Sequence, residues 1–213
     1  MGLIKLLPRS LSMALFYMKA KKVAARNTLT NEEKIKKIHR LENSCIDDIT
    51  EIIHGSSEQD VAIAIGLKDM SKIYLQLNEP DEALRYLSVV ENVFPTFVKM
   101  KSDKESIFEG FLFSLFYRGR AYAMKGNVEQ CAEQFDLLNK EVNERISKDP
   151  SNSRLVDVYV FFNSKFFNTM IEIPKDHPAK KQEAYNTCLR FLKIFETRDP
   201  GNEQLLDYIG RFH

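Results

Sequence analysis

The chain has 213 residues, of which 44% are hydrophobic and 29% are charged, and these proportions are ordinary for a globular protein. Only 8 glycines and 7 prolines interrupt a pervasive helical spacing of apolar residues, which favours an all-α protein. Three widely spaced cysteines, Cys45, Cys131 and Cys188, exclude a disulfide framework and show no metal-binding spacing, so we expect them to be buried as small hydrophobic residues.

The net charge of +1 conceals an uneven distribution. Residues 1–31 contain six of the 31 basic residues and no acidic residue, which leaves 25 basic against 30 acidic residues in the remainder. A basic head on a mildly acidic body differs from the broad basic face of a nucleic-acid-binding protein. We therefore expect no nucleic-acid partner.

The first predicted element is a basic amphipathic segment over residues 1–29. Its basic residues are Lys5, Arg9, Lys19, Lys21, Lys22 and Arg26. The apolar run that ends at Met18 is too short to span a bilayer. A basic, serine-containing and acid-free segment is typical of mitochondrial targeting, and we expect a location at the inner membrane or on the matrix side. The alternatives are an interfacial membrane anchor, a structural arm lying on a partner and, for location, the cytoplasm.

A long helix is predicted next, starting at Thr30, which forms a capping box with Glu33. Apolar residues continue along one stripe as far as Ile53, and Gly55 then ends the pattern. Ser57 can cap the following helix. These two helices are expected to form an extra hairpin before the first recognisable repeat.

Residues 64–95 contain two amphipathic helical patterns joined by a tight turn at Asn78 and closed by Pro95. The spacing of Leu67, Ser71, Tyr74, Ala83 and Leu87 resembles one unit of the tetratricopeptide repeat family. In that family, small residues such as Ser71 and Ala83 stand where the two helices touch. Asn78 replaces the family's turn glycine, and asparagine also tolerates a left-handed backbone.

Residues 112–143 resemble a second unit, in which Leu115, Gly119, Tyr122 and Gly126 repeat the first pattern 48 residues later. Asn127 and Gln130 are predicted to cap its second helix. Further on, the sequence DPSNSRLVD at 149–157 recurs as DPGNEQLLD at 199–207. This echo predicts a third hairpin over residues 153–198, with its turn at 174–178, and a C-terminal capping helix over 203–212.

Together these patterns predict an all-α fold: an array of antiparallel helical hairpins over residues 30–213, similar to a tetratricopeptide α-solenoid, behind the basic N-terminal segment. We find no glycine-rich phosphate loop, nucleophile motif or helical metal spacing. We therefore expect neither enzymatic activity nor a cofactor.

The resemblance implies that a protein partner binds the concave face, which is lined by the first helix of each hairpin. The candidate residues on that face are Lys68, Lys72, Gln76, Phe113, Phe116 and Arg120. Aromatic side chains beside fixed cations suit a peptide with apolar anchors and some acidic residues. The alternative is that Phe113 and Phe116 pack on the linker or on a neighbouring hairpin.

The resulting hypothesis is a structural or accessory subunit of a mitochondrial, membrane-associated multiprotein complex. One alternative is a soluble adaptor or assembly factor that binds a peptide in its concave face. Another is a membrane-surface receptor anchored by residues 1–27. Lys72 stands where relatives that bind chaperone tails carry an asparagine, so we disfavour that function.

Overall fold

The computed structural model describes residues 8–45, 58–91, 93–95 and 105–198, and all regular structure within these ranges is helical. The all-α prediction is therefore confirmed for the described part of the chain. The chain divides into two compact units, Met1–Ala121 and Tyr122–His213, which are described separately. The division lies inside helix α6 (Glu105–Met124).

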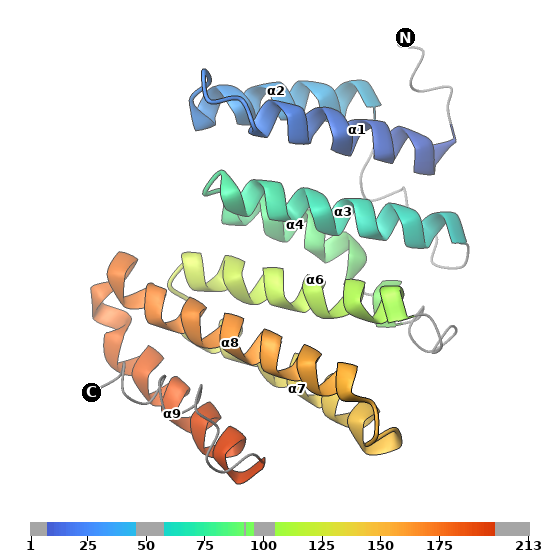
Figure 1. Cartoon of the computed structure of the whole chain (residues 1–213). Helices are drawn as coiled ribbons and strands as arrows, with labels where there is room; N and C mark the ends of the chain where they lie inside the picture. Colours follow the sequence, from blue (N-terminus) through green and yellow to red (C-terminus); the bar gives the residue numbers. More distant parts are fainter. Residues whose placement is uncertain (1–7, 46–57, 92, 96–104, 199–213) are drawn as a thin grey trace. The chain divides into compact units, whose positions relative to one another are not determined.

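The first unit is built from helices that pack side by side (Figure 1). They are α1 (Arg9–Ala24), α2 (Asn31–Cys45), α3 (Glu58–Gln76), α4 (Pro80–Val90) and most of α6. Helix α1 contacts both α2 and α3, and α3 contacts α4. The connections within the pairs α1–α2 and α3–α4 are short, so each pair forms a helical hairpin.

The N-terminal basic segment supplies a packed helix. On α1, Met13, Phe16 and Ala20 are buried. Close approach to α3 depends on Gly66, because a Cβ atom there would lie 2.9 Å from Cγ of Met13. Helix α1 therefore packs on the helices that follow the predicted boundary at residue 29. The targeting role of this segment stays a prediction.

The hairpin of α3 and α4 follows the pattern read from the sequence. Leu67, Ser71, Tyr74 and Ala83 are all 0% exposed. The buried Ser71 hydroxyl donates a hydrogen bond to the Lys68 carbonyl oxygen at 2.6 Å, so it is satisfied within its own helix. The turn residue has φ of 64°, which confirms the left-handed backbone predicted for Asn78. Helix α4 ends at Val90, and residues 93–95 are helical again, so helical residues are described up to the predicted stop at Pro95.

The capping box at the start of α2 is confirmed. The Thr30 backbone N–H donates to Glu33 Oε2 at 2.9 Å, and the Glu33 N–H donates to Thr30 Oγ1 at 3.2 Å. Helix α2 is described as far as Cys45. The rest of the predicted stripe up to Gly55, and the predicted cap at Ser57, lie outside the described residues.

A polar cluster joins α2 to the hairpin of α3 and α4, and we call Glu42, Glu82 and Arg85 the polar latch. The Arg85 guanidinium donates two hydrogen bonds of 2.9 Å to the Glu42 carboxylate. It also donates to Glu82 Oε2 at 2.9 Å. At the other end of α2, Asn31 Nδ2 donates to the Leu77 carbonyl oxygen at 3.2 Å. These bonds fix the position of α2 along the hairpin.

The second unit contains α7 (Val128–Lys148), α8 (Ser153–Asp176), the 3₁₀ turn η2 (Pro178–Lys180) and α9 (Lys181–Arg198) (Figure 1). Helix α8 contacts both α7 and α9. The core of the unit is aromatic: the Phe166 ring lies between Phe135, at a centroid distance of 4.2 Å, and Phe191, at 4.5 Å. The predicted third hairpin is therefore present as α8 and α9.

The predicted turn of that hairpin is wrong at its start. Helix α8 continues through Pro174 and ends at Asp176. Pro174 lies in the last turn and donates no backbone hydrogen bond, but the helix continues past it, and the His177 N–H donates to the Ile173 carbonyl oxygen at 2.9 Å. The turn consists instead of His177 and η2. The predicted capping helix at 203–212 lies outside the described residues.

The turn before α7 confirms two further predictions. Gly126 has φ of 70°, as expected from its alignment with Asn78. The Asn127 side chain caps α7 by accepting a hydrogen bond of 3.2 Å from the Gln130 N–H. His177 closes over this turn, and its Nε2 donates to the Met124 carbonyl oxygen at 2.9 Å. The histidine thus ties the end of α8 to the turn that precedes α7.

Candidate functional site

In the first unit, one predicted partner-binding residue of α3 contacts one of α6. Lys68 Nζ lies 5.6 Å from the centroid of the Phe113 ring. One turn earlier, Ile65 Cγ1 lies 4.0 Å from the position that a Cβ atom of Gly110 would occupy. Residues of α3 therefore meet residues of α6 in the same order along both helices, which places the two predicted sets of side chains on neighbouring helices.

The Lys68 side chain is mostly, though not fully, buried in this site. Its Nζ lies 2.8 Å from Asp69 Oδ1, and only 12% of its side chain is exposed. The ammonium group also stands over the Phe113 ring, which favours a cation–π contact. Because Asp69 already neutralises its charge, Lys68 offers little charge to an incoming carboxylate. Its contact with the Phe113 ring instead helps to hold that ring in place.

The other candidates differ in exposure. Lys72, Gln76 and Arg120 are exposed, and Phe113 is half-buried. Phe116 is only 7% exposed and therefore contributes to packing more than to a binding surface. We define the α3–α6 face as Lys72, Gln76, Phe113 and Arg120.

Two tyrosines near this face are not among the predicted partner-binding residues. Burial raises the pKa of Tyr117 to about 12, with the Asp69 carboxylate adding to the effect and Arg120 opposing it. The pKa of Tyr17 is raised by burial and then by Asp69. Asp69 therefore lies close to a tyrosine of α6 and to a tyrosine of α1. The sequence does not predict the second contact, because the basic composition of α1 indicates a separate targeting segment.

The basic residues of the N-terminal segment lie mostly on the surface. Arg9, Lys21, Lys22 and Arg26 are exposed, Lys19 is half-buried, and Lys5 lies outside the described residues. Leu11 and Met18 on α1 are also exposed, by 46% and 50%. In the part of the chain that the structure describes, no helix combines the length and apolar character needed to cross a bilayer.

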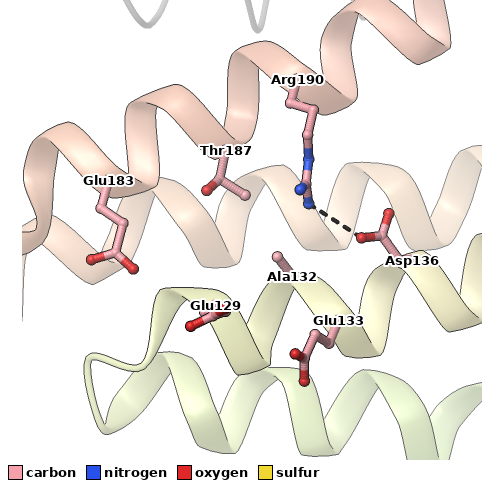
Figure 2. A pocket seen from close by; sticks show the side chains of 7 residues that line it. All are labelled: Glu129, Ala132, Glu133, Asp136, Glu183, Thr187 and Arg190. Atoms are coloured by element: carbon pink, nitrogen blue, oxygen red, sulfur yellow. Dashed lines mark hydrogen bonds and ion pairs between the residues drawn. The ribbon is translucent and has the colours of Figure 1, made fainter.

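A second candidate site lies in the second unit, where a cavity of about 400 Å³ opens between α7 and α9 (Figure 2). We call it the α7–α9 groove, and its lining residues are Glu129, Ala132, Glu133, Asp136, Glu183, Thr187 and Arg190. Four of these seven side chains are carboxylates and one is a guanidinium. Arg190 Nη2 lies 3.2 Å from Asp136 Oδ2 across the groove. Glu183 is paired with Lys180 at 2.8 Å.

The groove follows from the packing around α8. The aromatic core holds α7 and α9 against α8, while small side chains such as Ala132 and Thr187 leave space between their outer turns. Partial burial raises the pKa of Asp136, and the nearby Arg190 acts in the opposite direction. The acidic residues of the groove come from two helices about 50 residues apart in the chain, so no local sequence motif predicts the groove.

The buried thiols do not form a reactive site. Cys45, Cys131 and Cys188 are all buried, which confirms the prediction. Burial raises the pKa of the Cys131 thiol to about 12, and it also raises that of Cys188. Such thiols stay protonated at neutral pH and are poor nucleophiles. Among the described residues, no group of three or more histidine, cysteine, aspartate or glutamate side chains is placed to hold a metal ion.

Comparison with known proteins gives no match for this chain among protein-family models, curated proteins or solved structures.

Proposed function

We propose that the protein is a non-catalytic interaction scaffold of tetratricopeptide-like helical hairpins, and that it acts as an accessory subunit of a membrane-associated mitochondrial complex. The observation that carries the proposal is the α3–α6 face. The exposed Lys72 and Gln76 follow Lys68 at one-turn spacing on α3, and the exposed Arg120 lies two turns after the half-buried Phe113 on α6, so helical periodicity puts each set on one side of its helix. A helical surface of this kind suits a segment of another protein better than a small substrate.

The chemistry of the face selects the partner segment. Lys72 and Arg120 attract acidic side chains, while the Phe113 ring, which Lys68 contacts, offers an apolar anchor point. The bound segment should therefore carry at least one carboxylate beside an apolar or aromatic residue. We expect the bound segment to be either extended or helical, because the side chains of two neighbouring helices can match the residue spacing of either conformation.

Two further observations support the scaffold and its location. The small residues Ser71 and Ala83 are fully buried in the hairpin of α3 and α4, as the family resemblance implies. The exposed basic residues of α1 retain the charge pattern that favours mitochondrial targeting. In a native mitochondrial extract the protein should elute in a large complex. Elution at its own mass of 24.7 kDa would favour the soluble adaptor instead.

Charge reversal tests the face directly. Lys72→Glu with Arg120→Glu should reduce recovery of co-purifying partners by about tenfold or more in quantitative mass spectrometry, because each change replaces attraction by repulsion. The matched control reverses Lys36 and Arg40, two exposed cations of α2. Equal recovery with both double variants would overturn the proposal.

A second candidate function is a membrane-surface receptor anchored by α1. It is favoured by the exposed Leu11 and Met18, which lie two turns apart and therefore on the same side of the helix, with exposed Lys22 one turn further. Flotation with anionic liposomes should then fall sharply for Leu11→Ser with Met18→Ser. The control changes Leu137 and Ile194, exposed apolar residues of the second unit, to serine.

A further inference from the structure

Helix α1 combines the composition of a removable targeting segment with the burial of a core helix. It carries four basic residues and no acidic residue, a pattern typical of segments that direct a chain to mitochondria. Yet Met13 is only 1% exposed, and Phe16 and Ala20 are 0% exposed. A segment that is cut away after delivery has no use for a packed face in the mature protein. The burial of α1 therefore indicates a second role.

Helix α3 is shaped to receive α1, and the two helices lie side by side (Figure 1). A Cβ atom at Gly66 would lie 2.9 Å from Cγ of Met13, closer than side-chain carbons normally approach. Glycine lowers the stability of a helix interior, so its place in the middle of α3 is explained by this contact. One turn further along both helices, burial raises the pKa of Tyr17 and the Asp69 carboxylate adds to the effect. The contact thus extends over more than one turn of each helix.

The connection after α1 is structured as well. The Ala25 N–H donates to the Lys21 carbonyl oxygen at 3.1 Å, and the Arg26 N–H donates to the Val23 carbonyl oxygen at 3.1 Å. Helix α2 then begins behind the capping box of Thr30 and packs on α1. Proteases cut chain segments that open locally. Docking therefore disfavours a cut between α1 and α2.

We propose that α1 is a permanent part of the folded protein and that its docking on α3 protects residues 8–29 from proteolytic removal. The docked side holds Met13 and Phe16, whereas Leu11 and Met18 remain exposed on the opposite side. The helix can therefore meet a receptor or a membrane surface without leaving α3. Together with the proposed mitochondrial location, on which this point depends, docking makes residues 8–29 a targeting segment that is not cleaved.

Limited digestion of the isolated full-length protein with trypsin tests the docking, because Lys19, Lys21 and Lys22 become cleavable when α1 leaves α3. Ala20→Gln places a polar amide in the buried contact and should speed cleavage in α1 by about tenfold or more. The matched control is Ala14→Gln, the same change at an exposed position of α1, which should stay within about twofold of the unchanged protein. Equal rates for both variants would overturn the proposal.

A second pair of variants reaches the same contact from α3 and leaves the sequence of α1 intact. Gly66→Leu should also speed cleavage in α1 by about tenfold or more, because its side chain and that of Met13 cannot occupy the same space. Ala62→Leu introduces the same residue at an exposed position of α3 and should have little effect. Circular dichroism spectra check that each variant is folded. No difference between Gly66→Leu and Ala62→Leu would contradict the docking.

Retention of α1 is tested with the protein purified from cells. Trypsin releases Ser10–Lys19 from α1 and Gln182–Arg190 from α9, and labelled standards allow both peptides to be quantified by mass spectrometry. We expect equal amounts of the two peptides. Absence of Ser10–Lys19 would overturn the proposal. Purification from another compartment with both peptides present would contradict the proposed location and would still support the retention of α1.

Discussion

Each of the two units is stabilised internally by a different kind of interaction. In the first unit, α2 is fixed to the hairpin of α3 and α4 by the polar latch, in which the Arg85 guanidinium bonds the Glu42 carboxylate through both of its terminal nitrogens. In the second unit, α7 and α9 are joined through α8 by the stack of Phe135, Phe166 and Phe191. Polar contacts fix one relative position, whereas aromatic burial supplies stability with less directional demand.

The surroundings of the latch show how an ion pair is accommodated in a packed hairpin. Arg85 stacks on the Tyr86 ring at 4.7 Å, and Tyr86 lies 5.3 Å from Tyr74. Burial is the largest cause that raises the pKa of both tyrosines, and the nearby carboxylate of Glu42 adds to it. The charged groups thus sit at the edge of an aromatic cluster, where the Glu42 side chain is 12% exposed.

The largest effect is expected from Phe166→Ala in the second unit. The ring is 0% exposed and touches aromatic residues of both neighbouring helices. Its removal should lower the free energy of unfolding by about 3–5 kcal/mol, because a cavity is left at the centre of the core. Denaturant unfolding measures the loss, and amide hydrogen exchange should place it in α7, α8 and α9. A loss spread equally over α1 to α4 would contradict the comparison.

The next effect concerns the two turns with positive φ. Gly126→Ala should cost about 2–3 kcal/mol, because the added Cβ is strained at φ of 70° and would lie 2.8 Å from the His177 ring. The control is Asn78→Gly in the first unit, where φ is 64° and glycine adopts the backbone without strain. Thermal unfolding should show no loss for that variant. Equal losses at both turns would disprove the role assigned to His177.

A smaller effect is expected when the polar latch is broken. Glu42→Gln should lower stability by about 1–2 kcal/mol, a value reduced from that of a fully buried pair because 38% of the Arg85 side chain is exposed. Hydrogen exchange should increase in α2 and leave α9 unchanged. The double variant Glu42→Met with Arg85→Met should regain part of the loss, since no unpaired charge remains. Additive losses would show that the two side chains do not act as a pair.

The smallest effect is a difference in alkaline stability. The pKa of Cys131 in the folded protein is raised from its usual 9.0 to about 12. The contribution of this buried, protonated thiol to the free energy of unfolding is therefore complete below pH 9 and is lost as the pH rises from 9 towards 12. Tyr74 and Tyr86 ordinarily titrate near 10, so the corresponding loss in the first unit begins about one pH unit higher. By pH 9.5 the second unit should lose on the order of 1 kcal/mol for each buried thiol.

Hydrogen exchange at pH 8 and pH 9.5 can separate these contributions. Cys131→Ala with Cys188→Ala should flatten the pH dependence of the second unit and leave that of the first unit unchanged. An equally steep decline in the alanine variant would show that other groups carry it.

Local structure was predictable because it depends on residues near in sequence. The capping box of Thr30 and Glu33, the cap at Asn127 and the left-handed turn at Asn78 each involve at most four consecutive residues. The buried positions of α3 followed from helical periodicity. The error at Pro174 has a local cause too, because sequence alone does not distinguish a proline in the last helical turn from one in the following loop.

Contacts between distant helices were not predictable in the same way. The pairing of Glu42 with Arg85 depends on how far α2 slides along the hairpin, and the meeting of Asp136 with Arg190 depends on the packing of α8. The basic composition of residues 1–29 indicated targeting and concealed the packing of Met13 on Gly66. Of the six candidate partner-binding residues, the structure leaves Lys72, Gln76 and Arg120 exposed, a distinction that periodicity could not make.

Site-specific photocrosslinking from Gln76 tests the central claim most directly, namely that the chain acts by holding a partner segment on the α3–α6 face. Gln76 is exposed on this face, and Ser88 is an exposed control on α4. We predict that a photoreactive residue at position 76, in intact mitochondria, gives one dominant crosslinked partner that is lost with Lys72→Glu and Arg120→Glu. Position 88 should not give this product. The same products from both positions, or none from position 76, would contradict the account.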